Sequence, residues 1–353
     1  MKSSTITGNG KTSHNSLTFS YLHPTILTDL CYLRHMKTLF ITFLLLFCSP
    51  QRDTLNAMFW NLENFFDYRN DSTSVSDADF SSRGARRWTK KRFYTKCNAV
   101  TKGVLWASAE QGSLPDVIGF AEIENAFVLR RLLQATVLRK LDYEILHFDS
   151  PDRRGIDVAL LYRKSRLRLL SAKPCHLYNA DSTIMATRDI LIGLFVYADR
   201  DTLAFAVNHH PSKFGGEKVS QERRRIAVDR LRFLADSLQA LGIRQIICMG
   251  DFNDTPDNPV YKRLEPTLIN QSSALNKKAE GTIKYAGKWE LIDMFFTSAA
   301  VKDAQMSIIY IPFLQVQDKA SVGTKPLRTY SGPRYLGGVS DHCPIWLRWS
   351  ISD

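Results

Sequence analysis

The sequence has few cysteines and lacks the spacings that mark common metal, nucleotide and serine-nucleophile sites. Its six cysteines form no C-x-x-C pair, so neither a zinc ribbon nor a dithiol redox motif is indicated. The absence of a P-loop and of G-x-G-x-x-G argues against those modes of nucleotide binding. The absence of a G-x-S-x-G elbow disfavours a serine esterase. We expect Cys248 and Cys343, beside strand-like runs, to be buried free thiols.

Acidic residues are also in short supply. The chain has 47 lysines and arginines against 35 aspartates and glutamates, which gives a formal net charge of +12. Such a charge favours anionic partners such as nucleic acid, phospholipid head groups or phosphorylated metabolites, although it also serves solubility alone. Basic and aromatic residues alternate over residues 83–102. This mixture is typical either of a contact with a nucleic-acid strand or of a solvated helix face.

The N-terminal region reads as a targeting segment rather than as part of a fold. Residues 1–35 are polar and without periodicity. Residues 36–50 start with Met36 and Lys37 and continue into an apolar run that is too short to span a bilayer, which is the pattern of a secretory signal peptide. We therefore expect Met36 to be the true start and residues 1–35 to be a non-native or disordered extension. The protein would then be secreted or periplasmic, and Cys48 leaves a lipoprotein anchor open.

From Thr54 onward, short apolar runs alternate with helical patterns. The runs predict buried strands at 55–60, 116–120, 156–162, 190–196, 202–207, 245–249, 291–296 and 344–349. Helices are predicted over 90–109, 125–138 and 217–241, the last ending at Gly242. Because no linker divides this region, we predict one domain over 54–352, with two sheets packed face to face and flanked by helices.

Polar clusters follow several of these strands, at 61–64, 121–125, 208–213, 250–254 and 340–342. Because an unpaired buried charge is costly, carboxylates at so many strand ends indicate one convergent site. Glu122 is a candidate ligand for a hard cation, with Glu124 as its competitor. Asp251 and Asn253 alternate in sequence, so in extended backbone they point the same way and are suited to hold an attacking water.

Seven motifs, which include these clusters, occur in an order that resembles the endonuclease/exonuclease/phosphatase superfamily. They are NLEN, DVIGFAEIEN, RRGIDVALLYR, NHHPSK, GDFND, IDMFF and SDH. The resemblance extends from Leu55 to Trp349 and is greatest to secreted bacterial members. It implies an α/β fold, a four-layer α/β/β/α sandwich of two packed mixed sheets flanked by helices.

The resemblance also implies a role for individual residues. The implied metal ligands are Asn61, Glu122 and Asp341, the catalytic residues are His209, Asp251, Asn253, Asp293 and His342, and the phosphate contacts are Arg154 and Asn253. Asp341 is expected to orient His342. His209 is favoured over His210 as the phosphate-facing imidazole, because it keeps the H-x-x-S-K spacing, but the second histidine leaves the choice open.

The activity implied by the resemblance is metal-dependent hydrolysis of a phosphoester by in-line attack of water. The expected ion is Mg²⁺, with Mn²⁺ or Ca²⁺ as alternatives, and the expected enzyme is a phosphodiesterase or nuclease acting on DNA or RNA. A sphingomyelinase-like phospholipase and an inositol or sugar phosphate phosphatase are the alternatives, and a basic binding module with a vestigial site is the non-enzymatic one. No obligate protein partner is evident. The substrate, the polarity of cleavage, the number of metals and the oligomeric state stay open.

Overall fold

The structure is a computed structural model that describes residues 53–69, 76–199, 201–213 and 216–351. The predicted extension at 1–35 and the predicted signal peptide at 36–50 lie outside the described residues, and so do Cys31 and Cys48. The four described cysteines are buried free thiols, as predicted for two of them: Cys97, Cys175, Cys248 and Cys343. No helix in the described part combines the length and apolar character needed to cross a bilayer.

The first large sheet contains both ends of the described chain. Its six strands have the order β13-β18-β1-β2-β4-β3. They are β1 (Thr54–Phe65), β2 (Val117–Ile123), β3 (Tyr143–His147), β4 (Asp157–Arg163), β13 (Lys302–Ile308) and β18 (Ile345–Ser350). Strands β1 and β2 are parallel, with Asn61 opposite Ala121. Because parallel neighbours end at the same edge of a sheet, the polar residues at the ends of β1 and β2 come together.

The second large sheet repeats this arrangement. Its six strands have the order β5-β6-β7-β8-β12-β9. They are β5 (Leu167–Cys175), β6 (Ile190–Tyr197), β7 (Asp201–His209), β8 (Gln245–Asp251), β9 (Ile269–Asn270) and β12 (Asp293–Thr297). Strands β7 and β8 are parallel with His209 opposite Asp251, and antiparallel β12 begins with Asp293 opposite Asp251. Three predicted catalytic residues therefore stand side by side at one edge.

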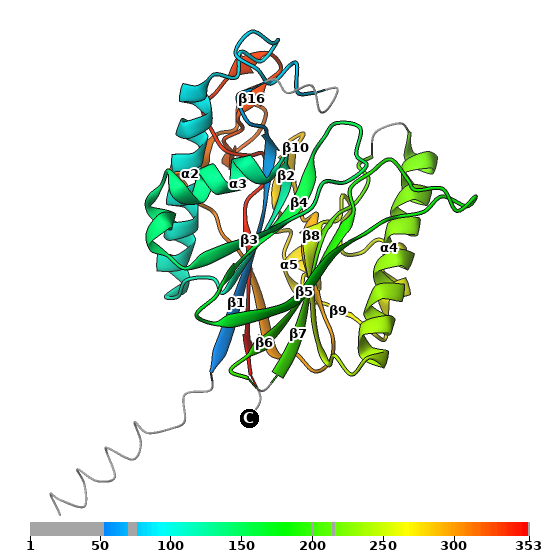
Figure 1. Ribbon diagram of the computed structural model, residues 1–353. Helices are drawn as coiled ribbons and strands as arrows, with labels where there is room; N and C mark the ends of the chain where they lie inside the picture. The colour runs from blue at the N-terminus through cyan, green and yellow to red at the C-terminus, as the bar shows by residue number, and fades with distance from the viewer. Residues whose placement is uncertain (1–52, 70–75, 200, 214–215, 352–353) are drawn as a thin grey trace, which may run out of the picture. The chain divides into compact units, whose positions relative to one another are not determined.

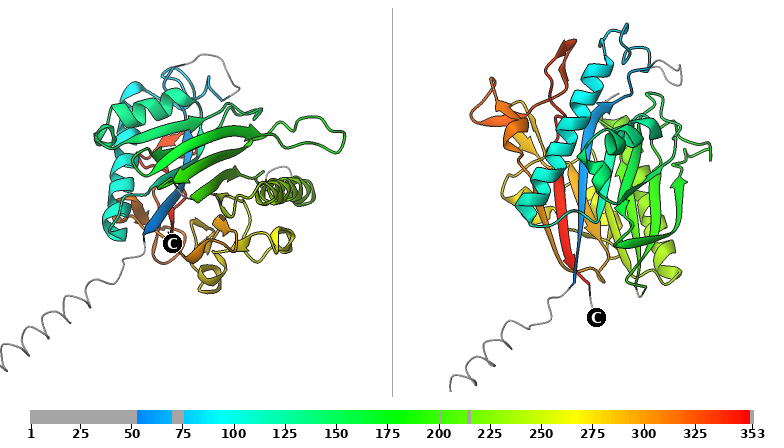
Figure 2. Two further views of the ribbon diagram at one scale, coloured as in Figure 1. Left: turned by 60° about the horizontal axis from the view of Figure 1, so that its bottom comes forward. Right: turned by 60° about the vertical axis from the view of Figure 1, so that its left-hand side comes forward.

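Helices cover the outer face of each sheet (Figures 1 and 2). The helices are α2 (Lys90–Gln111), α3 (Ala126–Gln134), α4 (Glu217–Ala240) and α5 (Ser273–Lys277), with 3-10 turns η1 (Val137–Lys140), η2 (Pro259–Leu264) and η3 (Pro312–Leu314). One apolar core joins α2 and α3 to the first sheet, a second joins the two sheets, and a third joins α4 and η2 to the second sheet. These three cores confirm the predicted four-layer α/β/β/α sandwich.

The helix ends follow from local sequence. Helix α4 buries Leu231, Leu234 and Leu238, the spacing that predicted it, and Gly242 just beyond its end has a φ of 84°. Helix α2 begins at Thr89, whose side chain accepts a hydrogen bond from the backbone N–H of Arg92, and it ends at Gly112 with a φ of 68°.

The two sheets are in direct contact, which fixes their shared edge. Phe205 of β7 lies against Trp349 of β18, with ring centroids 6.1 Å apart. At Gly119 of β2, a Cβ would lie 2.6 Å from the sulfur of Met249 in β8. A side chain there would force Met249, and to a lesser extent Phe59, to shift, so glycine suits this close approach of the two sheets. The strand ends of both sheets are therefore held in one place.

Short hairpins occur in segments where the sequence predicted no strand or helix. They pair β10 (Ile283–Tyr285) with β11 (Lys288–Glu290), β14 (Gln315–Gln317) with β15 (Thr324–Pro326), and β16 (Tyr330–Ser331) with β17 (Arg334–Tyr335). Figure 1 places β16 near the start of α2, on the side of the molecule where β1 and β2 end. The segment 317–338 borders the predicted site, since its Arg328 pairs with Asp341 at 3.0 Å.

Candidate active site

A single carboxylate, that of Asp251, is the centre of the convergent cluster. Its Oδ2 accepts a hydrogen bond from Nδ2 of Asn61 at 3.0 Å, and it lies 3.6 Å from Nε2 of His209. The same oxygen lies 3.9 Å from Nε2 of His342. Asn61 belongs to one sheet and Asp251 to the other, so this hydrogen bond joins the two sheets at the site. The predicted convergence of distant strand ends is present.

Asp251 is buried, and its carboxylate lacks a full counter-charge. Burial, opposed by His342 and reinforced by Asp293, raises the pKa of the Asp251 carboxyl to about 7. A carboxyl group with such a pKa exchanges its proton near neutral pH. It is also a group whose charged form a bound cation would stabilise.

Glu122 lies beside this centre because of a bulge at the end of β2. The register of β2 against β4 shifts between Ala121 and Ile123, and Glu122 has a φ of 63°. Its Oε2 accepts the backbone N–H of Asn64 at 2.7 Å, while Oε1 lies 4.0 Å from Nε2 of His209. Glu122 is therefore the acidic side chain that β2 delivers to the site.

Glu124, the competing candidate, is buried elsewhere. Its Oε2 accepts the backbone N–H of Asp67 at 2.6 Å and the side-chain amide of Asn125 at 3.2 Å. It thus fixes the turn after β1. The bulge explains the difference, because it breaks the alternation that would have put both glutamates on one face.

Several non-glycine residues of the site have left-handed backbone. The φ angles are 45° at Glu63, 49° at Asn64, 63° at Glu122 and 53° at Asn253. Such conformations cost roughly 1–3 kcal/mol each and persist where surrounding contacts determine them. Here the Asn253 N–H donates to Oδ1 of Asp251 at 2.9 Å and its Nδ2 donates to the His210 carbonyl at 2.9 Å. Asn253 therefore locks the turn that aims Asp251, in addition to any contact with substrate.

The carboxylate that orients His342 is Asp293. Its Oδ2 lies 2.8 Å from Nδ1 of His342, whereas Oδ1 of Asp341 is 3.9 Å from Nε2. The expectation that Asp341 orients His342 is wrong, because β12 brings Asp293 within hydrogen-bonding distance of Nδ1, whereas Asp341 is too far from the ring for a hydrogen bond. Burial alone would lower the pKa of His342, but Asp293 raises it well above its usual range. His342 is therefore an imidazolium near neutral pH.

The two histidines of the NHHPSK motif have different surroundings. His209 faces Asp251 and Glu122, whereas the ring of His210 packs on Phe252 with centroids 4.6 Å apart. Burial and the guanidinium groups of Arg188 and Arg154 hold the pKa of His209 well below its usual range. His209 is thus the imidazole at the site, and it is neutral.

Buried and half-buried basic residues that the sequence did not single out support the site. Arg188 donates from Nη2 to the His210 carbonyl at 2.7 Å and pairs through Nη1 with Asp152 at 3.0 Å. Lys96 of α2 is buried and donates to the Glu63 carbonyl at 2.7 Å. Arg188 had no sequence signal beyond a basic residue next to an apolar run, which is common at protein surfaces, and Lys96 belongs to the basic segment 83–102 without standing out in it.

Asp341 and Arg154 lie at the rim of the site. Asp341 is 34% exposed and pairs with Nη2 of Arg328 at 3.0 Å. Arg154 is 45% exposed, with Nη2 3.8 Å from Oε1 of Glu122. Both face the region above Asp251 and Glu122 without filling it.

A divalent cation fits this set of donors. Glu122, Asp251 and the amide of Asn61 offer oxygen ligands of the type that Mg²⁺ and Ca²⁺ prefer. The raised pKa of Asp251 is the independent sign, since an added positive charge would restore its carboxylate. Ligand atoms of Asp251, Asp293 and His342 also lie within 4.8 Å of one another, but His342 already pairs with Asp293. Glu122 and Asn61 are therefore more available to a metal ion than the paired residues His342 and Asp293.

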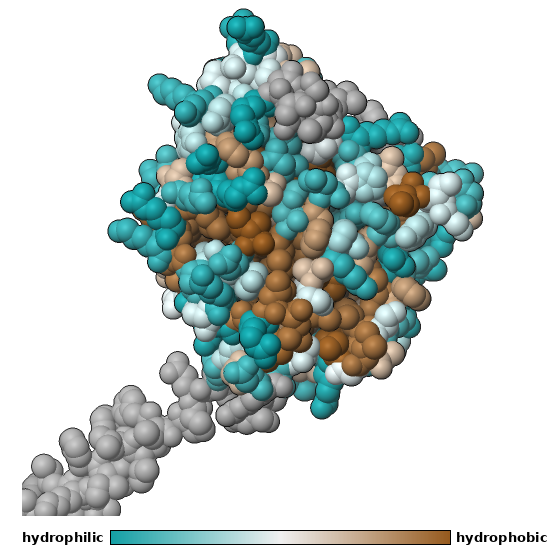
Figure 3. Space-filling view, viewed as in Figure 1, coloured by the Kyte–Doolittle hydropathy of each residue, from teal (hydrophilic) through white to brown (hydrophobic). Residues whose placement is uncertain are grey.

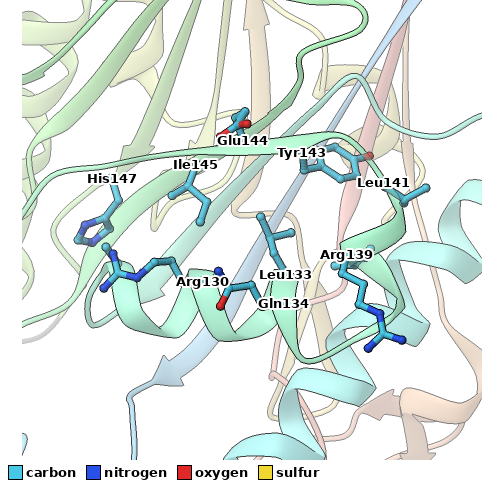
Figure 4. A pocket seen from close by; sticks show the side chains of 11 residues that line it. Arg130, Leu133, Gln134, Arg139, Leu141, Tyr143, Glu144, Ile145 and His147 are labelled. Atoms are coloured by element: carbon cyan, nitrogen blue, oxygen red, sulfur yellow. The ribbon is translucent and has the colours of Figure 1, made fainter.

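A hollow of about 530 Å³ between α3 and β3 lies apart from these residues (Figure 4). It is lined by Leu133, Leu138, Tyr143 and His147 among others, and by none of the predicted site residues. The apolar surface on that side of the molecule is visible in Figure 3. The polar strand-end cluster, and not this hollow, therefore holds the predicted catalytic and metal-binding residues.

Comparison with known proteins gives the chain a family. A model of the endonuclease/exonuclease/phosphatase family matches residues 56–350. Nocturnin from Xenopus laevis is 29% identical over 179 residues, which is 47% of this chain and 43% of Nocturnin. The chain thus matches less than half the length of that relative.

Solved structures share the fold at low identity. Truncated TDP2 from Caenorhabditis elegans has a TM-score of 0.55 at 13% identity, covering 84% of this chain and 98% of that chain. The human Nocturnin catalytic domain with bound sulfate has a TM-score of 0.52 at 17% identity, covering 86% and 98%. A family protein from Bacteroides thetaiotaomicron has a TM-score of 0.53 at 14% identity, covering 86% and 100%. With a family match that spans nearly all of the described sandwich, the chain belongs to the endonuclease/exonuclease/phosphatase family.

Proposed function

We propose that the protein is a Mg²⁺-dependent phosphodiesterase, most simply a nuclease, that cleaves its substrate by in-line attack of water. The observation that carries the proposal is the convergence on Asp251, whose Oδ2 lies 3.0 Å from Asn61, 3.6 Å from His209 and 3.9 Å from His342. Membership of the family supports a phosphoester as the bond that is broken.

Asp251 is the proposed acceptor of the proton from the attacking water. A bound cation would keep this buried carboxyl group ionised, so that it can accept the proton. His342, kept protonated by Asp293, would donate a hydrogen bond to a phosphoryl oxygen as negative charge builds there. His209 would donate a hydrogen bond as a neutral group, and Arg154 and Asn253 are the proposed phosphate contacts at the rim.

Glu122, Asn61 and Asp341 are the proposed metal ligands. A bound cation supplies polarisation of a nonbridging oxygen and stabilisation of the leaving oxyanion. Mg²⁺ is favoured over Mn²⁺ and Ca²⁺ because it keeps several waters and needs only one or two carboxylates. The pairing of Asp341 with Arg328 is consistent with few protein ligands.

A polyanion is the proposed substrate class, with DNA or RNA ahead of phospholipids and of inositol or sugar phosphates. The net charge of +12 supports a polyanion. The alternatives share the same core chemistry, so only a substrate panel separates them.

We expect the purified protein, without residues 1–50, to nick supercoiled plasmid in Mg²⁺ and to lose that activity in EDTA. The expected loss is about 100-fold or more, because the ion offsets transition-state charge. Choline-lipid vesicles and sugar phosphates, assayed in parallel, should release little head group or phosphate. Undiminished nicking in EDTA would contradict the metal role. Release of lipid head groups, with the plasmid left intact, would show that the protein is a phospholipase and not a nuclease.

We also propose that the protein is exported, from the signal-like pattern at residues 36–50. Mass spectrometry of the mature protein should show an N-terminus beyond residue 36. A mature chain that begins with Met1 would exclude this route.

A further inference from the structure

The segment before and within α2 has a concentration of positive charge that the fold does not explain. Between Phe80 and Ala109 there is no acidic residue, and there are eight basic ones: Arg83, Arg86, Arg87, Lys90, Lys91, Arg92, Lys96 and Lys102. Lys90 and Lys91 occupy the first turn of α2, which has no acidic residue. Positive charge is unfavourable at that end of a helix, so stability is not what these lysines provide.

The aromatic residues of this segment hold it rigidly in place. Trp88 is fully buried and donates from Nε1 to the Phe66 carbonyl at 2.8 Å. Phe80 stacks on Phe66 with centroids 4.4 Å apart, and the Tyr330 hydroxyl donates to the Arg86 carbonyl at 2.8 Å. Trp88 and Phe80 thus hold the segment in place and are not available to stack on nucleic-acid bases. The backbone that carries the basic side chains is therefore fixed by the packing of these aromatic residues.

Arg86 lines a hollow of about 140 Å³ that adjoins the catalytic cluster. The hollow is bounded by Glu63, Asn64, Phe80, Arg328, Thr329, Tyr330, Ser331 and Gly332 as well. Two of these residues contact site residues directly. The Asn64 N–H donates to Glu122 at 2.7 Å, and Arg328 pairs with Asp341 at 3.0 Å.

The two arginines of the hollow differ in their counter-charges. Arg328 is neutralised by Glu63 at 2.8 Å and by Asp341 at 3.0 Å. Arg86 donates to the Gly332 carbonyl, and no carboxylate of the described residues lies within 4.0 Å of its guanidinium. Arg92 next to it donates to the carbonyls of Arg86 and Arg87. Aromatic rings, and no carboxylate of the described residues, face these two guanidinium groups: Phe80 and Tyr330 lie by Arg86, and Tyr335 lies by Arg92. Within the described part of the chain their positive charge is therefore available to an anion.

We propose that Arg86 and the hollow beside Asn64 and Arg328 bind a second phosphate of the substrate, the neighbour of the phosphate that is cleaved. This inference rests on the proposed phosphodiesterase function and narrows it. The preferred substrate is then a polynucleotide strand that continues past the scissile bond toward α2, and not an isolated diester. A second phosphate is attracted by Arg86 and by the exposed Arg83 and Arg87 nearby.

The turnover test compares an unphosphorylated dinucleotide with the same dinucleotide carrying a 5′- or a 3′-phosphate, in Mg²⁺. We expect one added phosphate to raise kcat/KM about tenfold in the unmodified protein, and Arg86→Gln to abolish that advantage. The matched control is Arg168→Gln, since Arg168 is 61% exposed and pairs with Asp199 in the second sheet. If neither phosphate helps, or if Arg86→Gln keeps the advantage, the second-phosphate site is refuted.

A binding measurement separates this inference from the proposed function. A fluorescent single-stranded octanucleotide is titrated in EDTA at several salt concentrations. We expect Arg86→Gln to reduce the slope of log Kd against log salt by about one, Arg86→Lys to restore most of it, and Arg168→Gln to leave it near that of the unmodified protein. Equal slopes for Arg86→Gln and the unmodified protein would overturn the inference. If Arg86→Gln reduces the slope but the unmodified protein hydrolyses none of the dinucleotides, the second-phosphate site would be supported and the proposed nuclease function would be rejected.

Discussion

Asp251→Asn is expected to lower kcat on a phosphodiester by about 10³-fold or more, with the fold intact. The substitution keeps the size of the side chain and an acceptor for the Asn253 N–H, which Oδ1 of Asp251 accepts at 2.9 Å. It removes the group that takes the proton, and it removes the negative charge that the proposed cation would need. The measurement is single-turnover hydrolysis in saturating Mg²⁺, together with a thermal melt.

The folding stability of the Asp251→Asn variant gives a second test of the role of this carboxyl group. The carboxyl pKa is raised from 3.8 to about 7, so the folded state holds its proton more tightly than the unfolded chain does. Folding stability from this group is therefore full below the unfolded pKa and is lost as pH rises toward 7. In EDTA at pH 8, Asp251→Asn should melt at the same or a higher temperature than the unmodified protein.

Asp149→Asn is a matched control, because the Asp149 side chain is 90% exposed and the charge change is the same. It should leave kcat within about twofold, as expected for a surface substitution. A variant Asp251→Asn that kept a tenth of the activity or more would show that the central carboxylate does not carry the reaction.

The sandwich and the convergence of the site were predictable because both follow from short-range pattern. Apolar runs lead into Asn61, Glu122 and Asp251, which lie in the last part of β1, β2 and β8. Two parallel pairs then bring these ends to one edge of each sheet. The order of the motifs supplied the topology that composition alone does not give.

The details of the site depend on contacts between distant segments. The sequence analysis left some of these contacts undecided and predicted others wrongly. The choice of Glu122 over Glu124 follows from the bulge after Ala121, which a period-two pattern does not reveal. The choice of Asp293 over Asp341 as the partner of His342 depends on β12, which lies 49 residues away in sequence from His342. The Arg328 bridge between Glu63 and Asp341 comes from a loop without any regular pattern.

Edge strands were missed for a related reason. Strands β3, β5 and β13 bury only part of their residues, so their apolar signal is weak. The apolar run from Ile309 to Leu314 is buried at Ile309 and Ile311, yet it contains only the 3-10 turn η3 and no strand. Proline at position 312 explains this, because it cannot donate to a sheet ladder.

Asp293→Asn is expected to lower kcat by about 10²- to 10⁴-fold and to move the alkaline limb of the pH–rate profile to lower pH. Asp293 raises the pKa of His342 well above its usual range, so the protonated imidazole persists through neutral pH. Activity that needs this proton is lost as pH rises through the pKa of His342. Without the charge of Asp293 that pKa falls, and the loss begins at lower pH.

His342→Ala separates this role from a structural one. Since Asp293 and His342 act as a pair across 2.8 Å, the double variant Asp293→Asn/His342→Ala should lose little more than either single variant. Asp341→Asn is the competing test, because Asp341 lies 3.9 Å from Nε2 of His342. It should leave the alkaline limb close to its original position. A profile that moves with Asp341→Asn and stays fixed with Asp293→Asn would restore the adjacent aspartate as the residue that orients His342.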